Sequence, residues 1–204
     1  KGAVPTNCGL VYADAGRLML AGDVNNPHVH YMSRVDNPRD WDYAAADAGD
    51  DGAAYATSGE TGKINKPIIA LLAHGNDCLL DGHIDGVSVI IGNMRGGGEI
   101  VRTEQQVGPL MQSAWCKTAS DHTIMMTREG LYAIPGGCAR DINCQLISEQ
   151  LPNDLVGIDP GAEDTVAIGY DGRYHGVHIY VDRASGTDAH YFFDLKTRGF
   201  FPMS

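Results

Sequence analysis

Short strand-like segments separated by Gly, Asp or Asn recur along the whole chain, and this pattern constrains the fold more than any other feature. Most segments are about five or six residues long, which is typical of strands and too short for helices. They are Gly16–Ala21, His28–Ser33, Pro67–Ala73, Cys78–Asp81, Val87–Gly92, Glu99–Gln105, Ser113–Thr118, Thr123–Thr127, Gly130–Ile134, Cys144–Glu149, Thr165–Tyr170, Gly176–Asp182, Ala189–Leu195 and Gly199–Met203. The sequence therefore predicts an all-β fold.

Two of these segments show which faces they bury. Pro67–Ala73 is apolar on both faces, as expected of a strand covered on both sides. Gly176–Asp182 alternates, with Val177, Ile179 and Val181 on one face and His178 and Tyr180 on the other. The best helix candidate, Tyr43–Tyr55, is weak because it contains two glycines and lacks an apolar stripe.

An internal repeat decides between all-β architectures. The stretch DHTIMMTREGLY matches EDTVAIGYDGRY at five positions with a constant offset of 42 residues. A weaker copy lies 44 residues earlier, where Leu80 aligns with Ile124 and Gly86 with Gly130. A period of about 40–50 residues with about four strands is the size of a propeller blade. We predict a β-propeller, or a propeller fragment, of about four four-stranded blades; a β-sandwich or another multi-strand fold is the alternative.

The predicted blades form one domain over residues 1–204, at about 8–63, 64–107, 108–154 and 155–204. The first blade fits this period only if residues 44–63 are an insertion. That segment is small, acidic and non-periodic. We expect it to be exposed and mobile, because it can bury little apolar surface to offset its ordering entropy.

Composition excludes several classes of function. The 26 glycines and 9 prolines suit many tight turns. The net charge of −11 repels phosphate backbones, so no nucleic-acid partner is predicted. No stretch of about 18 apolar residues is present, so no membrane span is predicted.

The five cysteines are odd in number and contain no Cys-x-x-Cys pair, which argues against a zinc ribbon and a disulfide framework. Most are expected to be reduced, with Cys78 a buried core thiol. A bridge between Cys138 and Cys144 is the alternative left open.

The stretch HYMSRVDNPRDWDY contains most of the candidate interaction residues. The favoured interpretation is structural: Ser33 and Arg34 end a strand, and Trp41 packs on a neighbouring blade after the turn. The competing interpretation is sugar stacking on Trp41 or Trp115, with Asp40 and Asp42 as polar neighbours.

No catalytic, cofactor-binding or metal-binding residues are predicted. Neither a Gly-x-Ser-x-Gly elbow nor a His-Glu-x-x-His motif occurs. His28 and His30 share a strand face but lack a third ligand nearby. A glycosidase needs two carboxylates about 5–10 Å apart. The available aspartates are at positions that a turn would also favour: Asp81, Asp85, Asp171 and Asp182.

Several longer stretches resemble β-propeller virion proteins of tailed bacteriophages, of the tail-hub or packaged-DNA-stabilisation type. They are GRLMLAGDVNNPHVHYMSRVDNPRDWDY, KPIIALLAHGNDCLLDG, GPLMQSAWCKTASDHTIMMTREGLYAIPGG and HYFFDLKTRGFF. The shared features are a Gly-Arg-apolar strand, an Asn-Pro strand ending in Ser-Arg, a Pro-x-x-Trp turn and a strand ending in Gly-Leu-Tyr. Four modules are fewer than the five to seven common in such propellers.

This resemblance implies a structural virion component, a tail hub or adaptor without catalytic residues. Its implied partners are other virion proteins and further copies of itself, and its implied location is the virion, or the soluble cytoplasm before assembly. The alternative function is a carbohydrate-binding or glycoside-hydrolase-like propeller, for which the ligand would be a glycan.

The charge balance generates a first prediction. The chain should not bind duplex DNA even at about 50 mM salt, because its acidic surface presents too few Lys and Arg side chains to displace the counterions of the phosphate backbone. A gel-shift assay measures this directly, and a tight complex at that salt concentration would refute it.

Overall fold

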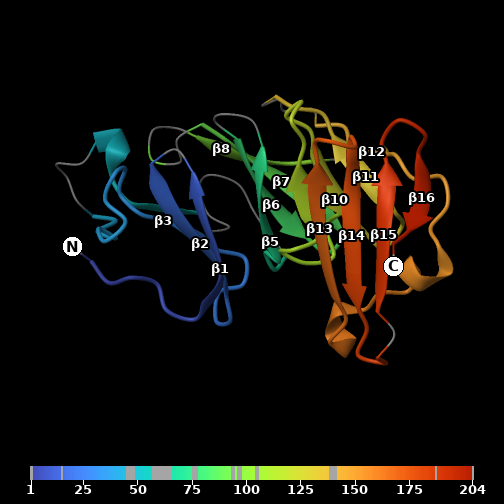
Figure 1. Cartoon of the computed structure of the whole chain (residues 1–204). Coiled ribbons are helices and arrows are strands. Elements are labelled where there is room, and N and C mark those ends of the chain that lie inside the picture. Colours follow the sequence, from blue (N-terminus) through green and yellow to red (C-terminus); the bar gives the residue numbers. More distant parts are fainter. Residues whose placement is uncertain are drawn as a thin grey trace.

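The computed structural model is an all-β molecule with four separate four-stranded antiparallel sheets (Figure 1). The structure describes residues 2–14, 16–44, 49–56, 66–74, 78–92, 95, 98–103, 106–137, 142–186 and 188–203. Within these residues helix is limited to three short 3₁₀ turns: Gly49–Asp51, Asn153–Leu155 and Pro160–Ala162. No helix in the described part of the chain is long and apolar enough to cross a membrane.

Each sheet is formed by four strands that are consecutive in the described part of the chain. The strands of the four blades are, in order, β1 (Cys8–Asp14), β2 (Arg17–Asp23), β3 (His30–Met32) and β4 (Ala54–Ala56); β5 (Ala70–His74), β6 (Cys78–His83), β7 (Gly86–Ile91) and β8 (Glu99–Arg102); β9 (Trp115–Lys117), β10 (Thr123–Met126), β11 (Leu131–Ile134) and β12 (Gln145–Leu146); and β13 (Thr165–Asp171), β14 (Gly176–Asp182), β15 (Ala189–Asp194) and β16 (Gly199–Pro202).

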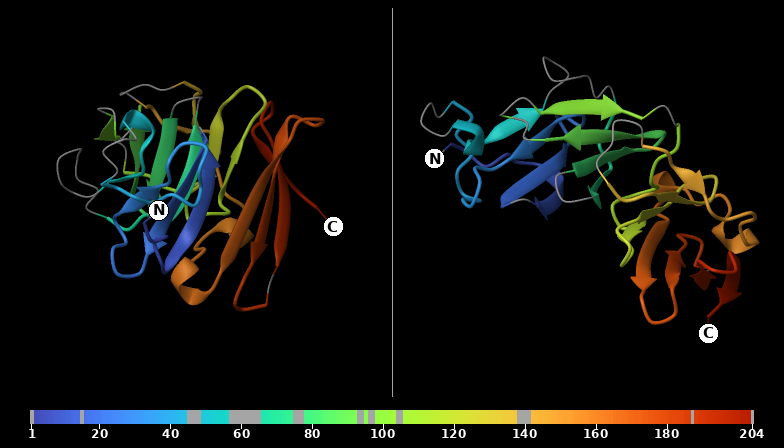
Figure 2. Two further views of the ribbon diagram at one scale, coloured as in Figure 1. Left: turned by 90° about the vertical axis from the view of Figure 1, so that its left-hand side faces the viewer. Right: turned by 90° about the horizontal axis from the view of Figure 1, so that it is seen from above.

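The four sheets are β-propeller blades arranged in an open arc. The first strand of each blade contacts the first strand of the next, so that β1 lies by β5, β5 by β9 and β9 by β13. The sheets do not close into a ring, and blades 1 and 4 form the two ends of the arc (Figure 2). The predicted all-β propeller architecture is therefore confirmed.

Two strands were not predicted from the sequence. β1 has the sequence CGLVYAD, which is apolar on both faces and shows no alternation. β4 is a three-residue Ala-Tyr-Ala strand that depends on pairing with β3. β4 lies inside the segment 44–63 that was expected to be an exposed insertion. This expectation is wrong for Ala53 and Ala54, which are buried; residues 45–48 and 57–63 of the segment lie outside the described residues.

The buried Arg17 and the half-buried Arg95 hold the described part of this segment in place. Arg17 donates hydrogen bonds to the carbonyl oxygens of Gly52 at 2.6 Å and Asp50 at 2.7 Å. Arg95 donates to the carbonyl oxygens of Tyr43 and Ala53, at 3.0 and 2.8 Å. Backbone acceptors can thus order a segment that is poor in apolar side chains.

The two sequence repeats differ in their structural meaning. The 44-residue offset aligns equivalent strands, because Leu80 lies in β6 and Ile124 in β10, the second strands of their blades. The stronger 42-residue offset aligns Thr123 of β10 with Thr165 of β13, which is the first strand of its blade. The stronger sequence match therefore aligns the second strand of blade 3 with the first strand of blade 4, which are not equivalent strands. It arises because hairpins of similar pattern recur within each blade as well as between blades.

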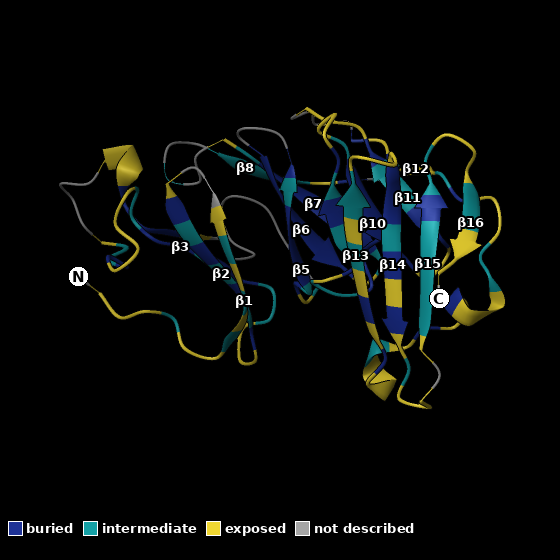
Figure 3. Cartoon of the chain, viewed as in Figure 1, coloured by how far each residue is buried: buried dark blue, intermediate teal, exposed yellow. Residues whose placement is uncertain are grey.

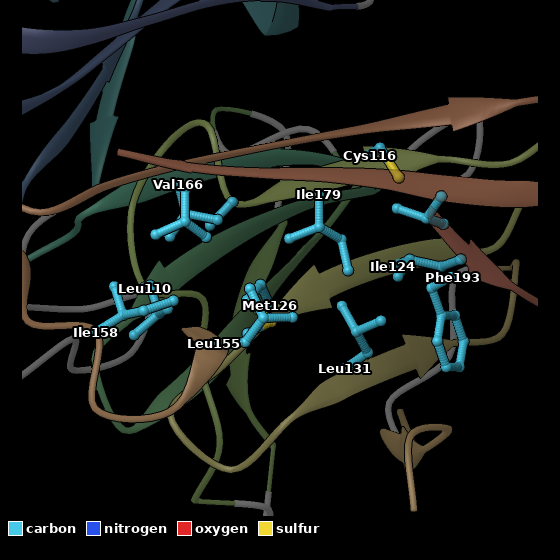
Figure 4. Packing of buried hydrophobic residues seen from close by; sticks show 13 residues of the cluster. Leu110, Cys116, Ile124, Met126, Leu131, Leu155, Ile158, Val166, Ile179 and Phe193 are labelled. Carbon is cyan, nitrogen blue, oxygen red and sulfur yellow. The ribbon is translucent and has the colours of Figure 1, made fainter. Parts of the chain in front are cut away.

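Apolar residues fill the space between every pair of adjacent blades. Blades 1 and 2 share a cluster of Met19, Ala21, Met32, Ala54, Ile68, Leu71, Leu79 and Ile90. A second cluster joins blade 2 to blade 3 and includes Leu80, Val89, Met125 and Ile134. The largest lies between blades 3 and 4, where the labelled side chains of Figure 4 interdigitate.

Buried polar contacts also cross two of these boundaries. Nδ1 of His30 in blade 1 lies 3.0 Å from Oδ2 of Asp81 in blade 2, and both side chains are fully buried. His74 of blade 2 reaches blade 3, with Nδ1 3.0 Å from Oγ1 of Thr123 and Nε2 2.9 Å from the carbonyl oxygen of Gly137. Asp81 was expected at a turn, but it lies within β6.

The cysteine predictions are only partly right. Cys78 is disulfide-bonded and not a core thiol, which is a correction. Cys8, Cys116 and Cys144 carry thiols, so the Cys138–Cys144 bridge is wrong; Cys138 itself lies outside the described residues. Burial raises the pKa of Cys144 to about 11. Sequence spacing missed the bonded state of Cys78, because it does not show which cysteines converge in space.

The contact between His30 and Asp81 generates a second prediction. Asp81→Ala should lower the free energy of unfolding by about 2–4 kcal/mol, because it leaves the buried His30 ring without its partner. Asp85→Ala, in the following turn, is the matched control. It removes a partly exposed ion pair with Lys66 and should cost less than about 1 kcal/mol. Equal midpoints for the two variants in urea unfolding would contradict a supporting role for Asp81.

A third prediction concerns acid. Burial lowers the pKa values of His74 and His83 below the ordinary value. Neutral His83 can satisfy both its contacts, since Nδ1–H donates to the carbonyl oxygen of Pro67 and Nε2 accepts from Ser88. The unfolded chain, with histidine pKa values near about 6.5, binds more protons below that pH than the folded chain does. Stability should therefore fall as pH drops from about 7 to about 5.5, above the range in which aspartates titrate.

Urea unfolding of the native chain and of His83→Gln over this pH range tests the third prediction. Gln can retain hydrogen bonds but cannot titrate, so the variant should lose less stability on acidification than the native chain. Identical pH dependences would show that His83 does not contribute.

Candidate interaction surface

The two end blades of the arc each have one sheet face that no other blade covers. In blade 4, Val177, Ile179 and Val181 are fully buried toward blade 3, as the alternation in this strand predicted. The intervening residues of β14, His178 and Tyr180, point to the opposite side. Figure 3 shows this alternation of buried and exposed positions along β14.

Cross-strand pairing extends this uncovered side across blade 4. One row runs from Gly169 through His178 and Phe192 to Phe201, and a parallel row from Ala167 through Tyr180 to His190. We use the name blade-4 open face for five of these residues: His178, Tyr180, His190, Phe192 and Phe201. Tyr180 and Phe201 are 45% and 49% exposed, so large rings of this face lie in solvent.

The rings of the blade-4 open face contact one another. Nδ1 of His178 lies 3.1 Å from Nε2 of His190, and the ring centroids of His178 and Phe192 are 5.2 Å apart. One of these two ring nitrogens donates the hydrogen bond and the other accepts it. Asp171 lies 3.5 Å from Nε2 of His178 at one end of the face.

Carboxylates lie at the other end of the same face. The hydroxyl of Tyr180 donates to Oδ2 of Asp188 at 3.3 Å. A hydrogen bond with Asp188, together with its charge, raises the pKa of Asp182. The face therefore has an aromatic centre and an acidic border.

Blade 1 has the corresponding uncovered side at the other end of the arc. Val11 pairs with Leu20, Leu20 with Tyr31, and Tyr31 with Tyr55, so one row crosses all four strands. We call these four residues the blade-1 open face. Val11 is 60% and Tyr55 52% exposed, whereas the alternating Met19 and its neighbours face blade 2.

Tyrosines continue this surface. Tyr43 packs edge-on against Tyr55 with ring centroids 5.0 Å apart. The hydroxyl of Tyr31 donates to Asp23 at 3.0 Å, and burial with this contact raises the pKa of Tyr31 to about 12. The phenol of Tyr31 therefore stays neutral at physiological pH and adds no charge to the face.

The residues predicted from the sequence do not gather into one site. Trp41 is 1% exposed, and its Nε1 donates to the carbonyl oxygen of Pro38 at 2.9 Å. A sugar needs an exposed ring face, which Trp41 lacks. Arg34 and Asp40 form an ion pair at 3.7 Å, and Asp42 accepts from the backbone of Ala44 at 3.1 Å. These four residues lie in the chain segment after β3.

Trp115 lies in a different place, on the first strand of blade 3. Its ring meets Tyr12 of blade 1 in a T-shaped contact with centroids 6.4 Å apart, and it packs on the core between blades 2 and 3. The half-buried ring thus joins blades that are not adjacent in sequence.

A pocket of about 300 Å³ lies between blade 3 and the segment that leads to blade 4. Its lining includes Arg128 and Asp159 beside the apolar Leu110, Leu155 and Ile158. In the described residues, no group of three or more His, Cys, Asp or Glu is arranged to hold a metal ion. His30 in particular contacts Asp81, and no contact joins it to His28.

Sequence reasoning missed the open faces as a site, although a signal was present. The alternation in Gly176–Asp182 placed His178 and Tyr180 on the side away from the core. Only the strand register brings His190 and Phe192 beside them.

Comparison with known proteins supports the fold. No protein-family model and no curated protein matches this chain. A solved structure, that of the N-terminal domain of Nup159, is similar over 92% of this chain with a TM-score of 0.53 and 10% identity. That domain is a β-propeller. The present chain spans 45% of its length.

Proposed function

We propose that this chain is a non-catalytic structural subunit that assembles with other proteins through the open faces of its end blades. The specific form implied by the sequence resemblance is a tail hub or adaptor in a tailed-phage particle. Its partners would then be neighbouring virion proteins and further copies of itself.

The blade-4 open face carries this proposal. A sheet with one face in water normally presents polar or charged side chains there. The two central rows of this face contain His, Tyr, Phe, Ala and Gly, and its aspartates, Asp171, Asp182 and Asp194, lie at the strand ends. Clustered exposed aromatic residues with a polar border are typical of protein interfaces.

The carbohydrate-binding alternative has less support. Trp41 has no exposed ring face, and Trp115 is engaged by Tyr12. The aspartates considered for catalysis serve other contacts: Asp81 pairs with His30, and Asp171 accepts from the backbone of Arg173 at 2.8 Å. No second function is proposed from them.

A co-purification experiment tests the proposed function. The tagged chain is co-expressed with the products of the genes adjacent to its own, one at a time. We expect at least one product to co-purify, and Phe201→Lys to reduce its recovery about tenfold or more, because an ammonium would be buried in an apolar contact.

Leu146→Lys is the matched control, since Leu146 is 48% exposed on the outer strand of blade 3 and lies on neither open face. It should leave recovery unchanged. Equal loss with both variants would contradict a role for the blade-4 open face. No co-purifying product, together with a rise in melting temperature on adding saccharides, would favour the carbohydrate alternative.

A further inference from the structure

We propose that His178 and His190 of the blade-4 open face form a binding site for a divalent transition-metal ion of the zinc and copper class. His178 lies on β14 and His190 on the adjacent β15. The side chain of His178 is 36% exposed, so an ion can reach the pair from solvent. The site needs no partner protein, and this inference therefore goes beyond the proposed assembly function and does not depend on it.

The distances within this pair are close to those of two imidazoles on one ion. Nδ1 of His178 lies 3.1 Å from Nε2 of His190, and the ring centroids are 5.2 Å apart. With metal–nitrogen bonds of about 2.0–2.1 Å and tetrahedral geometry, two bound imidazoles place their nitrogens about 3.3 Å apart and their centroids about 5.2 Å apart. An ion therefore fits between the two nitrogens after only a small rotation of the rings.

Cross-strand pairing holds the two rings in this arrangement. His178 pairs with Phe192, and Tyr180 pairs with His190, so the two histidines are diagonal neighbours on adjacent strands. The ring centroid of Phe192 lies 5.2 Å from that of His178, and the ring of Tyr180 meets His190 edge-on at 6.4 Å. These contacts limit the rotamers of both histidines, so less side-chain entropy is lost when an ion binds.

Asp171 makes the outer contact that metal-bound histidines commonly have. Its Oδ2 lies 3.5 Å from Nε2 of His178, and Nδ1 of the same ring faces His190. Its Oδ1 accepts from the backbone N–H groups of Arg173 and Tyr174, at 2.8 and 3.3 Å, and these bonds fix the carboxylate. A proton held on Nε2 by this carboxylate leaves the lone pair of Nδ1 for the ion.

Two neutral imidazoles can bind the ion without a net release of protons. In the hydrogen-bonded pair, one of the two facing nitrogens carries a proton. With the proton of His178 on Nε2, the proton between the rings belongs to Nε2 of His190. When the ion binds, this proton moves through solvent to Nδ1 of His190, and both facing nitrogens then donate their lone pairs to the metal.

The surroundings leave room for water and favour a cation. Gly169 pairs with His178, and a Cβ added to this glycine would meet no described atom within 4 Å. In the described residues no group of three or more His, Cys, Asp or Glu converges on an ion, so water would take the remaining positions. Asp171 and Asp182 at the strand ends and the net charge of −11 attract cations to this face.

Zinc titration of the purified chain tests the site, with the ring nitrogens followed by nitrogen NMR and the affinity by calorimetry. We expect Zn²⁺ to shift the signals of His178 and His190. Mg²⁺ should have no effect, because it prefers oxygen ligands. His178→Ala and His190→Ala should each weaken zinc binding by about tenfold or more, because a single imidazole remains.

His175→Asn is the matched control. His175 is an exposed histidine of the same blade, but its ring lies 3.4 Å from the hydroxyl of Tyr170, a residue that packs toward blade 3. Asn tolerates the left-handed backbone of this position, where φ is 53°. The affinity of this variant for zinc should equal that of the native chain.

Asp171→Asn tests the positioning role of the carboxylate. Asn keeps an acceptor for the backbone N–H groups of the turn but carries no charge, so zinc binding should weaken by about tenfold. The NMR signals should also show a smaller share of the Nε2–H form of His178 before zinc is added. A merely structural role for Asp171 would not change this share.

Three results would overturn the proposal. They are the absence of any shift of the two ring signals at about 1 mM zinc, an unchanged affinity in both alanine variants, and an equal loss of affinity in His175→Asn. Circular dichroism melting curves show whether each variant is folded. Because the titration uses this chain alone, its failure leaves the proposed assembly function untouched, and a failed co-purification leaves the metal site untouched.

Discussion

The packing of apolar sheet faces against one another is the constraint on which this structure depends. A four-stranded sheet of short strands is stable only when a neighbouring layer covers its apolar face, because isolated small sheets bury too little surface. Each internal boundary of the arc meets this need with a cluster of fully buried side chains, such as Leu71 between blades 1 and 2 and Phe193 between blades 3 and 4. The blades therefore stabilise one another in series.

Polar contacts add specificity to this apolar packing. The contact between His30 and Asp81 fixes blade 1 on blade 2, while Nε2 of His30 and Oδ1 of Asp81 make no further hydrogen bond. A buried pair of this kind is costly to break but contributes little net stability. We interpret it as fixing which residues of adjacent blades meet. His74, which hydrogen-bonds to Thr123 and Gly137, makes the corresponding polar contact between blades 2 and 3.

Much of the fold was predictable from the sequence, because period-two alternation and turn residues are local signals. The failures were at places where distant residues decide. β4 is a strand because β3 pairs with it, and Ala54 is buried because it reaches the cluster shared with blade 2. Trp41 was expected to follow a turn as a structural anchor, with an exposed stacking ring as the alternative, and it is buried just after the turn at residues 38–39. The bonded state of Cys78 depends on a spatial neighbour, which spacing does not reveal.

The same reasoning explains why the interaction surface was harder to predict than the core. The buried face of a sheet can be predicted from the sequence of one strand, since Val177, Ile179 and Val181 alternate with more exposed residues within β14. The open face requires β13, β14, β15 and β16 in register, and its meaning also requires knowing that none of the other three described sheets covers it. An aromatic row facing solvent is unremarkable in a single strand and significant in an assembled sheet. The end blades therefore differ from the internal blades in their neighbours, and much less in their composition.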